Sequence, residues 1–315
     1  MKKELFEKVV SSLNTKIDKN GNHLKMSSLI VSQGNRVYSH YFGQREMIDI
    51  RSIAKPILCL AVGAAINDGL CFNGDGISLD TPINKYIKRI VQFDDKSQEE
   101  RWDKIHLIDL FRITLGHDKG IVFSSDVKQV GEENLLSYVV NYPITHSIGE
   151  HFVYSNAGGY LMSALITEYC GMQADEFVNK YIFSKIGISE YTWKKYGKYC
   201  AGCTGLKLYN EDLHKIARLI YEDGVYNGRE IVPSEWIKQM RTPHVSSPTH
   251  RYIADRAFPK WSYGLNLWIT QDGNYYCDGT DGQYLIVIPH SGVVITSTAF
   301  QPDTTPVSEC LGLFK

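Results

Sequence analysis

The strand-like segments of this 315-residue sequence lie at its two ends, with helical patterns between them. Near the N-terminus, "SSLIVSQGNRVYSHYFG" holds two alternating, β-rich runs around Gly34-Asn35, a good signal for a two-residue hairpin turn. Near the C-terminus, Asp-Gly, Pro and Ser-Gly turns separate four short β-rich runs, "YGLNLWIT", "NYYCDGT", "GQYLIVIP" and "GVVITSTAF". This order predicts one sheet assembled from both chain ends, with a helical domain inserted between them.

Helices are expected at both termini and through the middle of the chain. In "MKKELFEKVVSSLNTKI", Leu5, Val9 and Leu13 fall on one helical face, and the last fifteen residues fit a short C-terminal helix. Between the strand regions, "IHLIDLFRITLG", "NLLSYVVNY" and "GGYLMSALITEYCG" have apolar residues three and four apart. We therefore expect residues 1–78 and 206–315 to form the sheet domain, and residues 79–205 the inserted, mainly helical domain.

Composition narrows the kinds of partner that the chain can have. Its 34 Lys and Arg stand against 35 Asp and Glu, so the net charge of -1 gives no electrostatic footprint for nucleic acid or for an anionic membrane. No apolar run approaches the roughly 20 residues that span a bilayer. Glu4, Glu7 and Lys8 interrupt any apolar core of a signal peptide. These features predict a cytoplasmic protein with no nucleic-acid partner and no membrane span.

Seven cysteines at scattered spacings argue against a disulfide framework and for reduced thiols. Cys200 and Cys203 form a C-x-x-C in "YCAGCTG". A zinc site would need a second pair of ligands, and a thioredoxin-like motif would need a preceding strand and a following helix. We interpret the two cysteines as small buried residues in a Gly-rich turn.

The stretch "DIRSIAKPILCLAVGAAINDG" places Ser52 and Lys55 where an apolar helix begins. Residues three apart lie on the same helical face, so the Lys55 amine can reach the Ser52 hydroxyl. A serine needs a base to act as a nucleophile, and a lysine serves when burial lowers its pKa. Free backbone N–H groups at a helix N-terminus also stabilise negative charge. Ser52 and Lys55 are therefore a candidate nucleophile and base.

A second Ser-x-x-Lys occurs at Ser125 and Lys128, in "SSDVKQV". No apolar helix follows to bury the Lys128 amine, so we interpret this copy as a coincidence. Ser125 thus serves as an internal comparison for Ser52.

Two further motifs accompany Ser52. "HFVYSNAGGYLM" contains Tyr154 and Asn156 in the sequence's Tyr-x-Asn, just before an expected helix. "YYCDGTDGQYLIVIP" places Gly279 and Gly282 at a strand edge, where a substrate can lie against the backbone. Taken alone, Tyr154 would be a packing residue and Asn156 a helix cap.

Ser-x-x-Lys, Tyr-x-Asn and a Gly-rich strand, in that order, resemble the serine β-lactamase and penicillin-binding-protein superfamily. The tyrosine form of the middle motif is similar to class C β-lactamases and to the related esterases, D-aminopeptidases and oligomer hydrolases. "DGISLDTPINKYI", "DLFRITLGHDKG" and "DGQYLIVIPHSGVVIT" also resemble family segments. The resemblance implies a β-lactamase-like α/β (α+β) fold. It has an antiparallel sheet flanked by N- and C-terminal helices and an inserted all-helical domain, with the active site between the two domains.

The resemblance also implies roles for individual residues. Ser52 would be the acylated nucleophile, Lys55 its base or proton partner, and Tyr154 a participant in proton transfer to the leaving group. Asn156 would position Lys55 and bind substrate. The backbone N–H groups of Ser52 and Thr280 would form the oxyanion hole.

The third motif departs from the family pattern. The family usually has Lys-Thr-Gly or His-x-Gly there, and this chain has Cys277, Asp278 and Gly279. An aspartate at this strand edge would repel an anionic substrate. Binding of a penicillin-type carboxylate is therefore put in doubt.

We expect a serine hydrolase that forms an acyl-enzyme with a small ester, amide or peptide-like substrate and uses no metal or cofactor. Esterase or amidase activity is the first choice. A β-lactamase or an acyltransferase on the same fold is the alternative, and a catalytically inactive binder or sensor is another. The sequence leaves the acyl group, the leaving group and the oligomeric state open.

Overall fold

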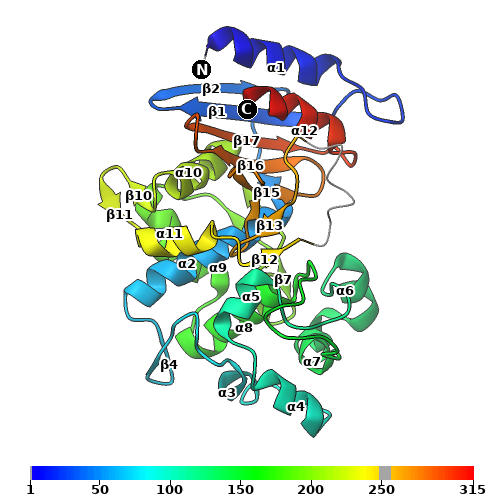
Figure 1. Cartoon of the computed structure of the whole chain (residues 1–315), viewed down its shortest axis with the longest axis vertical. Helices are drawn as coiled ribbons and strands as arrows, with labels where there is room; N and C mark the ends of the chain where they lie inside the picture. Colours follow the sequence, from blue (N-terminus) through cyan, green and yellow to red (C-terminus); the bar gives the residue numbers. More distant parts are fainter. Residues whose placement is uncertain (1, 248–256) are drawn as a thin grey trace.

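The computed structural model of the chain describes residues 2–247 and 257–315. Its main sheet is antiparallel, with the described strands in the order β12-β13-β14-β15-β16-β17-β1-β2 (Figure 1). The strands are β1 (Met26–Gln33), β2 (Arg36–Tyr41), β12 (Val245–Ser246), β13 (Ser262–Tyr263), β14 (Trp268–Ile269), β15 (Tyr275–Gly279), β16 (Gln283–Ile288) and β17 (Val293–Ala299). β1 pairs with β17, so the two ends of the chain share one sheet, as the sequence predicts.

The terminal helices cover one face of this sheet. α1 (Lys3–Thr15) and α12 (Thr305–Leu311) lie side by side there, and α10 (Asn210–Tyr221) packs on the opposite face (Figure 1). The α1 helix buries Phe6, Val9 and Leu13, whereas Leu5 is only half-buried. The apolar face is therefore turned slightly from the expected one, because the larger Phe6 side chain occupies the interior.

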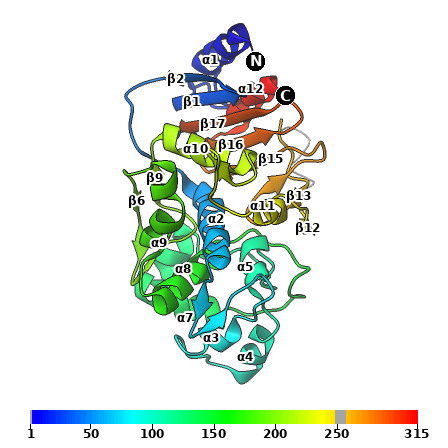
Figure 2. The same ribbon diagram turned by 90° about the vertical axis from the view of Figure 1, so that its left-hand side faces the viewer.

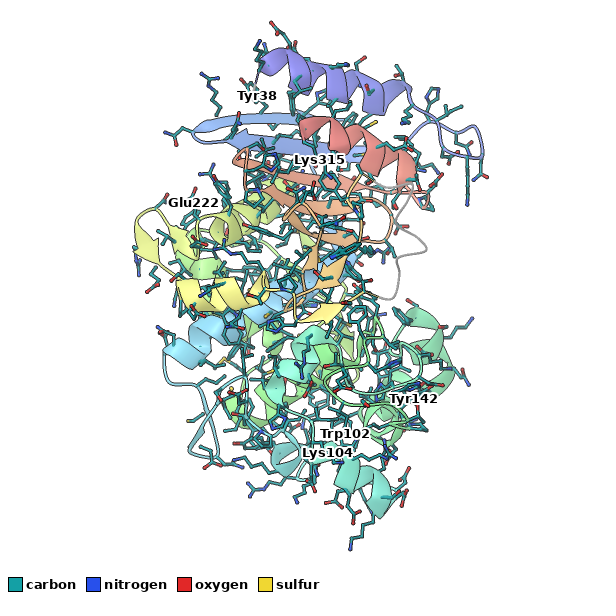
Figure 3. All side chains as sticks on the ribbon, in the orientation of Figure 1. Tyr38, Trp102, Lys104, Tyr142, Glu222 and Lys315 are labelled. Atoms are coloured by element: carbon teal, nitrogen blue, oxygen red, sulfur yellow. The ribbon has the colours of Figure 1, made fainter. Side chains whose placement is uncertain are left out.

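The region below the main sheet in Figure 1 consists mostly of helices. Their bounds are α2 (Ala54–Asn67), α3 (Asn84–Ile87), α4 (Lys96–Trp102), α5 (Leu107–Arg112), α6 (Ser124–Val130), α7 (Leu135–Asn141), α8 (Ala157–Cys170), α9 (Ala174–Tyr181) and α11 (Ser234–Met240). Short 3-10 helices are η1 (Arg51–Ile53), η2 (Glu132–Asn134), η3 (Phe183–Ile186) and η5 (Gly312–Phe314). Buried side chains tie the helices together. For example, the indole of Trp102, labelled in Figure 3, donates to the Val140 carbonyl at 3.0 Å and joins α4 to α7.

The middle of the chain also holds short strands that the helical patterns did not indicate. They are β3 (Ile48–Asp49), β4 (Cys71–Phe72), β5 (Asp75–Gly76), β6 (Thr192–Trp193), β7 (Lys195–Tyr196), β8 (Tyr199–Cys200), β9 (Leu206–Leu208), β10 (Val225–Tyr226) and β11 (Arg229–Glu230). Segments of two or three residues are too short for a periodicity of two to appear in the sequence.

Helix α2 connects the sheet to the helices below it (Figure 2). Every residue from Ala54 to Ala65 is buried, and the apolar side chains among them join a cluster that includes side chains of α8, α9 and the sheet. Ser52 lies at the sheet end of this helix, so a rigid element fixes its position. The division into domains at residues 78 and 205 stays a prediction. Among the described residues, no helix has the length and apolar character needed to cross a membrane.

Candidate active site

Ser52 and Lys55 lie one turn apart at the start of α2. Ser52 sits in η1 and Lys55 in the first turn of α2, with 2% of the lysine surface exposed. The Lys55 Nζ donates to the Ser52 Oγ at 3.1 Å and to the Tyr154 hydroxyl at 3.3 Å, and the Cys203 carbonyl lies 3.5 Å away. A single buried amine thus contacts both hydroxyl groups that the motifs predict.

Tyr154 reaches this amine from the loop before α8. Its ring stacks on the Trp268 indole, with ring centroids 5.5 Å apart and planes 18° apart, and Tyr263 meets it edge-on. Stacked aromatic side chains leave few rotamers open. The packing therefore fixes the Tyr154 hydroxyl next to Lys55.

Burial has opposite effects on the two groups. It lowers the pKa of Lys55 below the ordinary 10.5, because an ammonium ion loses its hydration there, and this effect outweighs the opposing influence of Cys203, Cys277 and Asp278. Burial raises the pKa of Tyr154 well above 10.0, and Cys277 and Asp278 add to the rise. At neutral pH Tyr154 keeps its proton, and Lys55 gives up its proton more easily than an ordinary lysine does.

Ser52 opens onto a cavity of about 410 Å³. Its lining includes Ser52, Tyr154, Lys260, Asp278, Gly279, Thr280 and Asp281. Asp278 and Gly279 of the third motif, together with Thr280, therefore share a cavity with the candidate nucleophile, although more than 220 residues separate them from Ser52 in the sequence.

Strand β15 brings the third motif to Ser52. β14 pairs only with Tyr275 and Tyr276, so among the described strands the last three residues of β15 pair with β16 alone. Gly279 is packed so closely that an added Cβ would lie 2.7 Å from the Ile50 carbonyl oxygen. This open edge beside η1 is a place where an extended substrate can lie against backbone.

Neighbouring residues of β15 point in opposite directions. Cys277 is buried, and its Sγ contacts the Ser52 carbonyl at 3.7 Å. Asp278 instead lines the cavity, where its carboxylate pairs with Lys260 Nζ at 2.9 Å. Asp278 is therefore a paired anion, not the isolated one that the sequence suggested.

Asn156 lies apart from this contact network. It stands at the N-cap position of α8 without capping the helix, and its Nδ2 donates to the Val122 carbonyl at 3.0 Å. Its buried Oδ1 has no hydrogen-bond partner among the described residues. The structure thus gives no Asn156–Lys55 hydrogen bond, and the positioning role stays a prediction.

Three residues around the site carry no motif in the sequence. Lys260 lies with its Nζ 4.5 Å from the Trp268 ring centroid, and Trp268 supports Tyr154. Asn266, with a left-handed backbone at φ 59°, donates its Nδ2 to the Lys55 carbonyl at 3.3 Å. All three lie before β15, and although Asn266 and Trp268 fall in the β-rich run "YGLNLWIT", that pattern predicts a strand and not a contact with the site.

The other features singled out in the sequence lie elsewhere. Ser125 and Lys128 are both exposed on α6, so the Lys128 amine is not buried next to the Ser125 hydroxyl. Cys200 and Cys203 are both buried and unbridged, in agreement with their interpretation as packing residues. In the described ranges no three His, Cys, Asp or Glu side chains cluster as metal ligands would.

Known proteins share this architecture. The chain superposes on the D-amino acid amidase of Ochrobactrum anthropi SV3 with a TM-score of 0.72 and 13% identity, over 99% of this chain and 98% of that one. For the penicillin-binding protein of Bacillus halodurans the TM-score is 0.70 and the sequence identity 16%, over 98% of this chain and 99% of that one. For EstCE1, a hydrolase with promiscuous acyltransferase activity, the TM-score is 0.73 and the sequence identity 13%, over 99% of this chain and 98% of that one. At these identities the likeness concerns the fold.

The sequence itself matches the model of a protein family called Beta-lactamase over residues 11–307. This match covers nearly the whole chain, including all three motifs. The protein therefore belongs to the Beta-lactamase family and has its fold.

Proposed function

We propose that the protein is a serine hydrolase that cleaves a small ester or amide through an acyl-enzyme on Ser52. The observation that carries the proposal is the Lys55 amine, which is buried and lies within hydrogen-bonding distance of both the Ser52 and Tyr154 hydroxyls. A nucleophile, a base with a lowered pKa and a second proton carrier at one point are what acyl transfer requires.

In the proposed first step, the Ser52 Oγ attacks the carbonyl carbon while its proton passes to Lys55. The carbonyl oxygen gains negative charge, which the backbone N–H groups of Ser52 and Thr280 would stabilise. The bond to the leaving group then breaks, and the leaving group takes a proton through Tyr154. In the second step water attacks the Ser52 ester, releases the acid and restores the serine.

The ion pair between Asp278 and Lys260 modifies the expected substrate preference. Asp278 alone would repel anions, but a cation 2.9 Å away cancels most of that field at the distance of a substrate. The wall of the cavity is thus close to neutral at this point. Uncharged esters and amides remain the first choice of substrate.

The central test compares the two Ser-x-x-Lys serines. Ser52→Ala should abolish labelling by a fluorophosphonate probe and all turnover of neutral p-nitrophenyl esters, whereas Ser125→Ala should leave both nearly unchanged. A dead Ser125→Ala protein with an active Ser52→Ala protein would overturn the assignment. Failure of the wild-type protein to take the label would favour the inactive binder or sensor.

A broader panel separates the remaining activities. Nitrocefin reports β-lactamase activity, and D-amino-acid amides report amidase activity. Adding a primary alcohol to an ester reaction and measuring the new ester separates acyl transfer from hydrolysis. Acyltransferase activity stays the alternative because EstCE1, which has the same fold, shows it.

A further inference from the structure

The strands β12 to β15 form a strip with two different faces. The cross-strand pairs Ser246–Ser262, Ser262–Ile269 and Ile269–Tyr275 set one row of side chains on one face, because directly paired residues point the same way. Val245, Tyr263, Trp268 and Tyr276 form the matching row on the other face. In this second row, Tyr263 and Trp268 pack against Tyr154 of the candidate active site.

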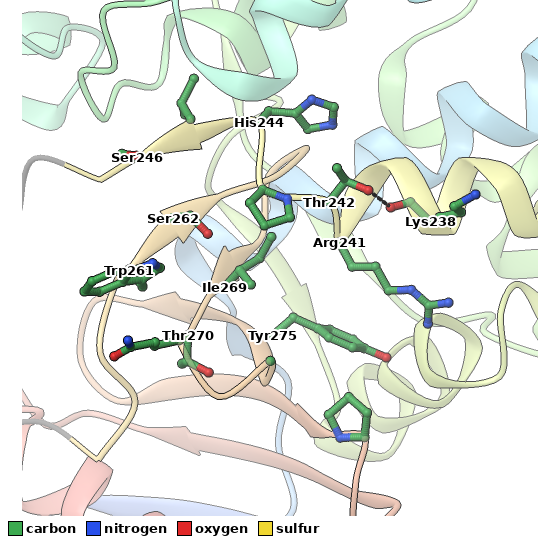
Figure 4. Close-up of a pocket in the computed structure, with 15 residues that line it drawn as sticks. Lys238, Arg241, Thr242, His244, Ser246, Trp261, Ser262, Ile269, Thr270 and Tyr275 are labelled. Atoms are coloured by element: carbon green, nitrogen blue, oxygen red, sulfur yellow. Dashed lines mark hydrogen bonds between the residues drawn. The ribbon is translucent and has the colours of Figure 1, made fainter.

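The first row lines a separate cavity of about 840 Å³, twice the size of the one at Ser52 (Figure 4). Helix α11 and the residues after it supply a further part of its wall, including Lys238 and Arg241. None of the residues lining the Ser52 cavity lines this one. The two cavities therefore lie on opposite faces of the same strip and can be occupied independently.

Two buried hydroxyl groups at this second cavity make no hydrogen bond of ordinary length to the described residues. Ser262 is 5% exposed and Tyr275 3% exposed, and neither the Ser262 Oγ nor the Tyr275 Oη has a hydrogen-bond partner at ordinary distance in the described structure. The Arg241 guanidinium is nevertheless close enough to the Tyr275 hydroxyl to oppose the rise in its pKa that burial causes. A buried hydroxyl without a partner costs on the order of 1–3 kcal/mol. Both residues belong to the same row of side chains, with Ile269 between them, and both line the cavity, which indicates that a bound molecule supplies hydrogen-bond partners.

The charge of the wall indicates what kind of molecule. Lys238 and Arg241 lie on it, and none of its described lining residues is an Asp or Glu. Arg241 also pairs with Asp223 at 2.8 Å, outside the lining, but a guanidinium has five N–H donors, more than one carboxylate occupies. In Figure 4 the Tyr275 hydroxyl points toward the Arg241 side chain. This end of the cavity suits an anionic oxygen group.

The other end of the cavity is apolar. The Trp261 indole, 43% exposed, lies at the opposite side of the view from Arg241, with Ile269 between them (Figure 4). An exposed tryptophan on a cavity wall is a common contact for an aromatic or aliphatic group.

We propose that this second cavity binds a small organic carboxylate with an aromatic or aliphatic body. The carboxylate takes hydrogen bonds from Arg241 and the Tyr275 hydroxyl, the Ser262 hydroxyl binds a polar atom in the middle, and the body packs on Trp261 and Ile269. This site does not rest on catalysis at Ser52.

The test uses 4-phenylbutanoate as the probe and titration calorimetry on the full-length protein. We expect saturable binding, weakened about tenfold or more by Tyr275→Phe and by Arg241→Gln, since a hydrogen bond to a charged group contributes about 1.5–3 kcal/mol. Tyr226→Phe, on β10 and outside the cavity, is the matched control and should keep the wild-type Kd. The uncharged 4-phenylbutan-1-ol should bind about tenfold more weakly or worse.

Two further measurements locate the probe and check the fold. Ser52→Ala should bind it with the wild-type Kd, because the catalytic cavity is separate. Without ligand, Ser262→Ala should keep or raise the melting temperature, since the Ser262 hydroxyl bonds to none of the described residues. No saturation at millimolar probe, equal binding of the alcohol, wild-type affinity in both cavity variants, or loss of binding in Ser52→Ala would overturn the proposal.

Discussion

At the scale of single residues, the site depends on how differently burial acts on an amine and on a phenol. The amine of Lys55 is disfavoured as a cation and the phenol of Tyr154 is disfavoured as an anion, so burial pushes both toward their neutral forms. The family resemblance implied Lys55 as the base or proton partner of Ser52 and Tyr154 as a participant in proton transfer. The directions of the two shifts favour Lys55 as the base and Tyr154 as the proton donor.

This assignment predicts the pH dependence. Activity should rise with pH as Lys55 loses its proton. The midpoint of this rising limb of the pH–rate profile should lie below the ordinary lysine pKa of 10.5, because burial lowers the pKa of Lys55. The measurement is kcat/KM for a neutral ester against pH, with the apparent pKa belonging to the coupled pair. Tyr154→Phe should lower the rate and keep the limb. A limb that disappears in Tyr154→Phe would assign the base to tyrosine instead.

The ion pair on the cavity wall predicts opposite effects for its two members. Asp278→Asn leaves Lys260 unpaired and should favour anionic substrates, and Lys260→Met leaves Asp278 unpaired and should disfavour them. For a partly exposed pair each change is roughly 1 kcal/mol, or about fivefold in the anionic-to-neutral ratio of kcat/KM. The double variant should return close to the wild-type ratio. A ratio that no single variant changes would show that substrates do not approach this pair.

At the scale of secondary-structure elements, the site depends on the close approach of β15 to η1. Gly279 allows it, since an added Cβ would lie 2.9 Å from the Arg51 Cβ and closer still to the Ile50 carbonyl oxygen. Arg51 adds an ion pair with Asp281 at 3.0 Å, just beyond the strand. The candidate oxyanion-hole residues Ser52 and Thr280 lie directly next to this contact in the sequence.

Gly279→Ala should therefore force β15 away from η1. We expect the free energy of unfolding to fall by about 1–3 kcal/mol. We also expect kcat to fall by a larger factor than KM changes, since the strand positions the reacting groups. Gly76→Ala, in β5, is the matched control, because its added Cβ meets nothing within 4 Å. Urea unfolding and steady-state kinetics measure both effects. Full activity in Gly279→Ala would contradict a role for this contact.

At the scale of the whole molecule, one buried histidine joins α10 to both ends of the chain. His214 on α10 has its Nε2 2.9 Å from the Ser32 Oγ of β1 and its Nδ1 3.1 Å from the Thr296 Oγ1 of β17. Burial lowers its pKa from 6.5 to about 4, and the nearby Arg218 adds to the shift. The sheet therefore holds this residue in its neutral form.

This histidine predicts a loss of stability in mild acid. Below about pH 6.5 the unfolded chain takes up the proton and the folded chain does not, so stability falls as pH drops toward 4. The full effect of one such group is about 3 kcal/mol. His214→Gln should make the free energy of unfolding less dependent on pH between 6.5 and 4, whereas His290→Gln, an exposed loop residue, should not. An unchanged slope in His214→Gln would exclude this explanation.

The sequence by itself determined the elements whose signals are local. Alternating residues around Gly34 predicted the hairpin of β1 and β2, and the apolar run after Lys55 predicted a buried helix with Ser52 at its start. The same run distinguished Ser52 from Ser125, because burial of the neighbouring amine can be read from the next ten residues. The assembly of one sheet from both chain ends followed from the order of these signals.

Only the tertiary structure decided which side chains meet across the chain. Lys260 neutralises Asp278, Trp268 supports Tyr154, and the Ser262 hydroxyl has no hydrogen-bond partner among the described residues. These relations join short strands and irregular segments whose residues have no periodicity. Their geometry follows from the twist and packing of the sheet, because contacts between residues far apart in sequence depend on the whole fold and not on any local pattern.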